Sequence, residues 1–139
     1  MLSKKFICAT YDYSTYQNFV PSPFFRKSFY VNKTAVECTV TIGGLGFYDI
    51  FINGQKITKG IIAPYVCNPD HIVYFDEYDV TRYLCEGKNV LGIQLGNGMQ
   101  NCPGGEIWDF EKASFRGAPR VAFSIKTEYS DGTVEVIEA

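Results

Sequence analysis

The side chains that most often perform acid–base, nucleophilic or metal chemistry are scarce or poorly spaced in this sequence. His71 is the single histidine, so a Ser-His-Asp system, a Cys-His system or a two-histidine zinc site would all have to use it. The five cysteines never form a C-x-x-C pair, which argues against zinc-ribbon and thioredoxin-type sites. We therefore expect no catalytic residue and no metal ligand in this chain.

Paired carboxylates remain to be considered, because glycosidases use one carboxyl group as an acid and a second as a base or nucleophile. Two groups occur along the chain: Asp76, Glu77 and Asp79, and then Glu106, Asp109 and Glu111. Neither group is accompanied by other features of a catalytic cleft, so solvated faces or caps explain both better. Asp109 and Glu111 could also bind calcium with loop carbonyls, but no EF-hand spacing supports this, and we expect no cofactor.

The segment from Gly96 to Pro119 is the strongest candidate for a binding function, because long loops without periodicity are usually functional or disordered. Sugars are bound by aromatic faces that stack on C–H bonds and by amide or carboxylate groups that bind hydroxyls. The loop holds both kinds of side chain: Trp108, Asn97, Asn101, Asp109, Phe110 and Arg116. In the alternative interpretation, Trp108 and Phe110 plug the end of the domain or dock against another domain.

The elements that would position this loop are predicted to be strands. Alternation of apolar and polar residues with period two, together with aromatic and β-branched residues, indicates half-buried strands. The expected strands cover residues 24–31, 36–42, 47–52, 72–78, 90–95, 120–129 and 133–137, with a short strand after the Asn53-Gly54 turn. We expect a turn at residues 43–46 and one helical turn within residues 79–87, capped by Asp79 or Thr81 and ended by Gly87.

This pattern predicts an all-β fold, an antiparallel β-sandwich at residues 24–139 preceded by an irregular arm at residues 1–23. A chain of 139 residues has room for one domain with a proper core. The net charge of −2 offers no electrostatic reason to bind nucleic acid or an anionic membrane. No export signal stands at the start and the cysteine count is odd, so we expect a cytoplasmic protein.

The order of several motifs resembles the N-terminal β-sandwich domain of bacterial α-L-rhamnosidases, a jelly roll of the galactose-binding-like group. The resemblance is carried by PFFRKSFYV at residues 23–31, GLGFYDIFINGQKI at 44–57, YDVTRYLCEGKNVLGIQLGNG at 78–98 and RGAPRVAFSIKTEYSDGTVEVI at 116–137. It spans most of the chain from Phe24 to Ile137. Each motif is weak alone, and their order makes the resemblance specific.

The resemblance implies that this chain is a non-catalytic accessory domain of a larger glycoside hydrolase. In the family, a separate (α/α)₆ barrel hydrolyses terminal α-L-rhamnose with inversion, and its catalytic glutamates correspond to nothing here. The implied partner is the catalytic domain of the same polypeptide, which this domain would pack against and position, with the loop from Asn97 to Phe110 near its substrate cleft. The alternative is an autonomous module that binds rhamnose-containing glycans through Trp108, Asn97, Asn101 and Asp109.

Overall fold

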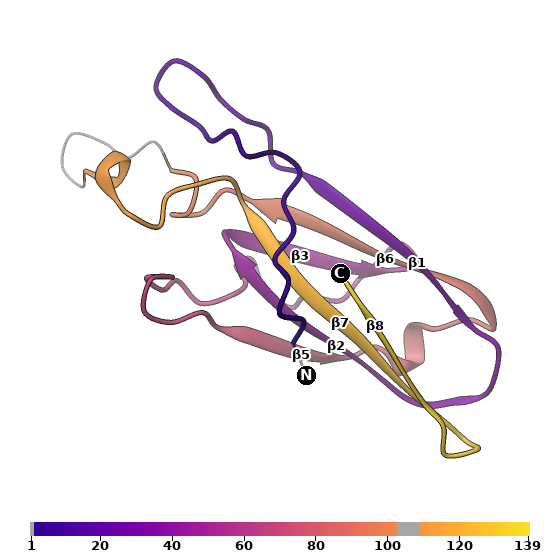
Figure 1. The fold of residues 1–139 in the computed structure, drawn as a ribbon. Helices are drawn as coiled ribbons and strands as arrows, with labels where there is room; N and C mark the ends of the chain where they lie inside the picture. The colour runs from indigo at the N-terminus through magenta and orange to yellow at the C-terminus, as the bar shows by residue number, and fades with distance from the viewer. Residues whose placement is uncertain (1, 103–108) are drawn as a thin grey trace.

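The protein is an antiparallel β-sandwich of two four-stranded sheets, as the sequence predicts (Figure 1). The computed structural model describes residues 2–102 and 109–139. One sheet has the strand order β1-β6-β3-β4 and the other the order β5-β2-β7-β8. The strands are β1 (Phe24–Val31), β2 (Ala35–Leu45), β3 (Phe47–Ile52), β4 (Gln55–Lys56), β5 (Phe75–Asp79), β6 (Gly87–Gly96), β7 (Arg120–Tyr129) and β8 (Val134–Glu138).

The core lies between the sheets and is formed by the inward-facing residues of the alternating strands. In β6 every second residue is buried, and β2 and β7 also bury residues between their inward-facing ones. Apart from Asn89 and Asn101, the largest fully buried side chains are aliphatic. They include Val40, Ile42, Ile50, Ile52, Leu91, Ile93, Leu95, Val121 and Ile125. Burial of each such side chain stabilises the folded state by about 1.5–3 kcal/mol. These residues all belong to this chain, so the core needs no partner.

Asn89 organises the end of the sandwich where β3 turns into β4. Its side chain is fully buried, and its Oδ1 accepts hydrogen bonds from Asn53 Nδ2 and Cys85 N, both at 2.8 Å. Its Nδ2 donates to Cys85 O at 2.7 Å and to Gly87 O at 3.1 Å. Asn53 holds the left-handed conformation (φ 51°) that the expected Asn-Gly turn requires. Asn89 and the Asn53-Gly54 turn therefore have structural roles.

The expected helical turn is a 3₁₀ turn, η1 (Thr81–Tyr83). Asp79 Oδ1 accepts hydrogen bonds from Thr81 N at 2.9 Å and Thr81 Oγ1 at 2.6 Å. The same hydroxyl oxygen accepts a hydrogen bond from Cys38 N at 2.8 Å, which ties the turn to β2. Gly87 does not end a helix; it begins β6 with φ 85°. The Asp-Val-Thr motif thus shapes the connection between β5 and β6 and fixes it to β2.

The turn predicted for residues 43–46 is wrong over most of its length. Gly43, Gly44 and Leu45 continue β2, and only Gly46 turns the chain, with φ 107°. The glycines serve close packing here. A Cβ on Gly44 would lie 2.8 Å from the ring of Tyr48, and one on Gly43 would lie 3.2 Å from the Leu2 side chain. Glycine in a strand is expected where another group approaches this closely.

The N-terminal arm, residues 2–23, has no strand of its own and lies along the sandwich (Figure 1). Ile7 forms an isolated antiparallel bridge with Val121, with N–H···O distances of 2.9 and 3.0 Å in the two directions. The arm then continues to the end of the sandwich that carries the connection from β6 to β7. No helix in the described part of the chain is long and apolar enough to cross a bilayer.

Candidate functional site at the loop end

Three irregular segments gather at one end of the sandwich, which we call the loop end (Figure 1). They are the distal part of the arm, the β4–β5 connection at residues 57–74, and the described parts of the β6–β7 connection, residues 97–102 and 109–119. The last of these contains a 3₁₀ turn, η2 (Phe110–Lys112). The predicted binding loop is therefore part of this end, between the arm and the β4–β5 connection.

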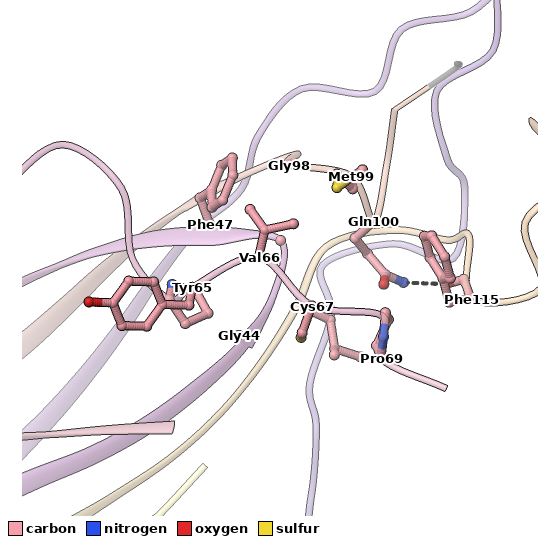
Figure 2. A pocket seen from close by; sticks show the side chains of 13 residues that line it. Gly44, Phe47, Tyr65, Val66, Cys67, Pro69, Gly98, Met99, Gln100 and Phe115 are labelled. Carbon is pink, nitrogen blue, oxygen red and sulfur yellow. Dashed lines mark hydrogen bonds between the residues drawn. The ribbon is translucent and has the colours of Figure 1, made fainter. Parts of the chain in front are cut away.

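A small pocket lies between the β4–β5 and β6–β7 connections, over the tight turn between β2 and β3 (Figure 2). It is lined by Gly44 to Phe47, Pro64 to Cys67, Pro69, Gly98 to Gln100 and Phe115. Its volume is about 30 Å³. A bound water needs about 10–15 Å³ by the same measure, so the pocket holds a group of one or two heavy atoms and not a pyranose ring.

Gln100 supplies the polar wall of this pocket. Its Nε2 donates to the carbonyl oxygen of Phe115 at 2.9 Å, the bond drawn in Figure 2, and its backbone oxygen accepts from Gly117 N at 2.9 Å. Its Oε1 is buried and has no hydrogen-bond partner among the described residues. A buried acceptor without a partner is costly, so a donor from water or a ligand would be favoured here.

Asn101 and Asn97, two of the predicted sugar-binding residues, are brought together, and Asn101 binds the arm. Asn101 is 1% exposed; its Oδ1 accepts a hydrogen bond from Ser14 N at 2.6 Å. Its Nδ2 donates to Asn97 Oδ1 at 2.9 Å and to Ser14 Oγ at 3.3 Å. Both polar atoms of the Asn101 amide are thus used within the protein.

Arg116 also joins the β6–β7 connection to the arm. Its guanidinium donates a hydrogen bond to the carbonyl oxygen of Ser14 and lies over the ring of Tyr13, 4.9 Å from the centroid. Its Nε is buried without a partner among the described residues. Asn101 and Arg116 therefore meet at Ser14 and hold the arm, and Asn97 accepts a hydrogen bond from the Asn101 amide beside them.

Asp109 and Phe110 lie farther along the same connection, at the start of η2. Asp109 is exposed, has a left-handed backbone (φ 49°) and pairs with Lys112 at 3.2 Å. Phe110 is half-buried. Trp108, the predicted stacking residue, and Glu106 lie outside the described residues, as does the side chain of Glu111.

The carboxylates of β5 have structural partners. Asp76 accepts a hydrogen bond from the hydroxyl of Tyr48, which reaches it from the other sheet. Burial and this bond raise the pKa of Tyr48 above its usual range. Glu77 Oε1 accepts from Thr41 Oγ1 at 3.1 Å, and the hydrogen bonds from Thr81 lower the pKa of Asp79. For Asp76 the expectation of a solvated face or a cap is wrong, because this side chain connects the two sheets.

The remaining reactive side chains do not assemble. His71 is exposed in the β4–β5 connection, where its backbone N–H donates to Asn68 O at 3.0 Å. Burial raises the pKa of the Cys38 thiol, which packs inside the sandwich beside Thr127 Oγ1 at 3.3 Å. Within residues 2–102 and 109–139, no three His, Cys, Asp or Glu side chains form a group that could hold a metal ion.

Sequence reasoning missed Gln100, Ser14 and Tyr13. Gln100 stands within the suspected loop, so its amide was as visible as those of Asn97 and Asn101. Ser14 carries no local signal, because its partner Asn101 lies 87 residues away. The loop end is thus a surface assembled from distant segments.

Two antiparallel sheets with clustered connections at one end define the protein as a β-sandwich domain. The structure of this chain resembles those of two α-L-rhamnosidases. The α-L-rhamnosidase from Dictyoglumus thermophilum matches 99% of this chain with a TM-score of 0.78 and 28% identity, and that from Aspergillus terreus matches 95% with 0.79 and 26%. In both, the match covers 15% of the enzyme chain.

The sequence comparisons agree with the structural ones. Residues 33–139 match the family model of the α-L-rhamnosidase N-terminal domain. An α-L-rhamnosidase from Formosa agariphila is 37% identical over 112 residues, which is 79% of this chain and 12% of the relative. The chain belongs to the family of α-L-rhamnosidase N-terminal domains, and it spans about one eighth of the length of this relative.

Proposed function

We propose that this chain is a non-catalytic accessory domain of an α-L-rhamnosidase-type glycoside hydrolase. It packs on the catalytic part, an (α/α)₆ barrel that hydrolyses terminal α-L-rhamnose with inversion, and positions it. The observation that carries this proposal is the match of residues 33–139 to a domain family, combined with relatives about eight times longer than the matched segment. The parent protein would act in the bacterial cytoplasm without a cofactor in this domain.

The side chains of the domain support an accessory role. The carboxylates of β5 are occupied by hydrogen bonds from Tyr48, Thr41 and Thr81. Asp49 is likewise engaged, by Lys56 Nζ at 2.8 Å and Thr58 Oγ1 at 2.6 Å. A general acid and a base or nucleophile must face a common substrate space, and these groups face structural partners instead.

The activity test compares three proteins with an aryl α-L-rhamnoside as substrate: this chain alone, the rhamnosidase polypeptide that carries it, and the same polypeptide without residues 1–139. We expect no turnover by this chain alone. We expect the shortened polypeptide to keep its chemistry but to lose thermal stability. Measurable hydrolysis by this chain alone would contradict the proposal.

The second candidate is an autonomous module for rhamnose-containing glycans. The observation that favours it is the buried Gln100 Oε1 in a pocket beside Phe47 and the exposed ring of Tyr65. The pocket itself is too small for a pyranose, so a sugar ring would stack outside it, and its hydroxyl would reach this oxygen only after the Gln100 side chain became accessible.

The glycan test is an amide NMR titration with L-rhamnose and a rhamnosyl disaccharide to tens of millimolar. Saturable shifts around Gln100 and of the Trp108 indole, lost in Trp108→Ala, would favour the binding module. A Gln100→Leu variant separates the two contributions, because it removes the acceptor and leaves Trp108 in place. A well-dispersed spectrum without shift changes for either sugar would argue against the binding module and favour the accessory role.

A further inference from the structure

We propose that residues 61–75 form the surface by which this domain docks onto the rest of the rhamnosidase. We call it the 61–75 surface. The inference rests on the proposed function, since its occupant is the remainder of that enzyme. Seven large apolar or aromatic side chains are exposed within these fifteen positions: Ile61, Ile62, Tyr65, Val66, Ile72, Tyr74 and Phe75.

The exposure of these side chains is unusually high for their type. Ile61 is 95% exposed, Tyr65 83% and Ile62 61%. Soluble monomers rarely keep large contiguous apolar patches in water, and such patches mark interaction sites. Exposing this many apolar side chains, close together in sequence, to water is therefore unfavourable. A complex in which a partner covers them would be stabilised by their burial.

The surface has a defined shape because the backbone beneath it is anchored. Tyr48 N donates to Ala63 O at 2.7 Å and Ile57 N donates to Ile50 O at 2.9 Å, so residues 57–63 run along the edge of β3. The rings of Tyr65 and Tyr74 meet edge to face with centroids 6.4 Å apart, which joins the two ends of the segment. A surface held in place loses less conformational entropy when it docks.

The chemistry of the exposed side chains favours a protein over a glycan. Ile61, Ile62 and Ile72 are aliphatic, whereas sugars need aromatic faces for stacking and polar groups for their hydroxyls. The covering protein is most simply the rest of the same enzyme, because the matched segment makes up 12% of the Formosa agariphila relative.

The outer faces of the two sheets suit water better. The outer face of β2 and β7 carries Glu37, Lys126 and Glu128, and Lys126 pairs with Glu128. On the outer face of β1 and β3, Phe24 and Phe51 are interrupted by Arg26 and by the Lys56–Asp49 ion pair. Charged groups at an interface core must be desolvated, so these faces make poorer docking sites.

The test is hydroxyl-radical footprinting of this chain alone and together with the rest of the rhamnosidase, joined to it or mixed with it. The isolated chain is a suitable reference because its core is closed by its own residues. We expect labelling of Tyr65, Ile72 and Tyr74 to fall to near background in the complex. Tyr30 and Val136, exposed on other surfaces, should label equally in both.

A triple variant, Ile61→Ser with Ile72→Ser and Tyr74→Ser, should weaken docking by about 10²-fold or more, because it removes three apolar contacts. The matched control is Tyr30→Ser with Val36→Ser and Val136→Ser, which removes side chains of similar type and exposure and should leave docking unchanged. All six positions are exposed, and unchanged melting temperatures of the isolated variants would show that both sets still fold.

The outcomes separate this inference from the proposed function. Protection of another face, with the 61–75 surface labelled as in the isolated chain, would overturn the inference and keep the accessory role. A complete lack of protection would overturn both. Protection of the 61–75 surface by L-rhamnose instead of the enzyme would overturn the choice of a protein occupant.

Discussion

At the scale of single residues, buried polar side chains specify how the strands connect. Asn89 joins the Asn53-Gly54 turn to the chain after η1 through four hydrogen bonds. Tyr48 joins the two sheets through Asp76. In the interior such groups are costly without their partners, so each position tolerates few substitutions.

Asn89→Ala should lower the free energy of unfolding by roughly 2–4 kcal/mol, because it removes the side-chain partner of both Cys85 backbone groups and one of the hydrogen bonds of Asn53 Nδ2. Urea denaturation measures the change. Asn32→Ala is the matched control, since Asn32 is exposed, and it should change stability by no more than about 0.5 kcal/mol. Equal effects of the two substitutions would rule out a structural role for the Asn89 amide.

Tyr48 should make the protein less stable at alkaline pH. Its pKa is raised in the folded state by burial and by Asp76, so the unfolded state loses the phenol proton first, near pH 10. The stabilisation from the neutral phenol is complete below that pH and declines as pH rises through the raised folded pKa. We expect Tyr48→Phe to be less stable at pH 7 but to lose less stability between pH 9 and about pH 12.

The measurement is urea denaturation at several pH values. Tyr11→Phe serves as the comparison, because Tyr11 is 85% exposed on the arm. If Tyr48→Phe and Tyr11→Phe had the same alkaline profile as the unmodified chain, the phenol of Tyr48 would not be the group responsible.

At the scale of elements, a close approach of backbone decides where β2 ends, and side-chain hydrogen bonds decide where the arm lies. Gly46 turns the chain between β2 and β3 against the start of the β6–β7 connection. Ser14 holds the arm to that connection through Asn101 and Arg116. These contacts join segments that are distant in sequence, and they shape the loop end.

Gly46→Ala should be more damaging than a typical glycine substitution at positive φ. A Cβ there would lie 2.5 Å from the carbonyl oxygen of Gly96, so the clash adds to the strain of φ 107°. We expect a loss of roughly 3 kcal/mol or more, measured by thermal and urea unfolding. Gly60→Ala is matched in φ (88°) but meets nothing within 4 Å, and should cost about 1 kcal/mol.

Asn101→Ala should release the arm without unfolding the sandwich. It removes the acceptor for Ser14 N, so amide exchange in residues 11–20 should become at least about tenfold faster, while β7 stays protected. Mass spectrometry of the exchanged peptides checks this. Asn18→Ala, at an exposed position of the same arm, is the control. Unchanged exchange in Asn101→Ala would show that the arm is held by other contacts.

At the scale of the whole molecule, the sandwich combines a closed core with an apolar surface at one end. The core clusters side chains from both sheets, including Phe29, Val40, Ile50 and Phe123. Ala63 packs against this core, but the large apolar side chains of the 61–75 surface are exposed to solvent. Stability and interaction are therefore assigned to different parts of the molecule.

The isolated chain should therefore unfold in a single cooperative transition, as a domain of this size with one core does. Far- and near-ultraviolet circular dichroism and fluorescence should give the same midpoint in urea. Separate midpoints, or a near-ultraviolet signal that is absent in water, would mean that the isolated chain does not complete its own packing. The footprinting reference would then have to be the intact polypeptide carrying the triple variant.

The strands were largely predictable because their pattern is local. The predicted strands at residues 24–31 and 120–129 coincide with β1 and β7, whose apolar and aromatic residues mark them locally as strands. Residues 72–74 were predicted as strand but precede β5, and residues 87–89 were missed at the start of β6. Both errors lie at element boundaries, where tertiary contacts such as those of Asn89 outweigh local pattern.

The sequence by itself determined the β-sandwich and, through ordered motifs, the family, because period two and turn residues act within a few positions. The tertiary structure decided what individual side chains do. Asn101 meets Ser14 across 87 positions and Tyr48 meets Asp76 across 28, so their roles depend on how the sheets pack. The 61–75 surface became visible only when the folded chain showed which apolar side chains the core leaves in water.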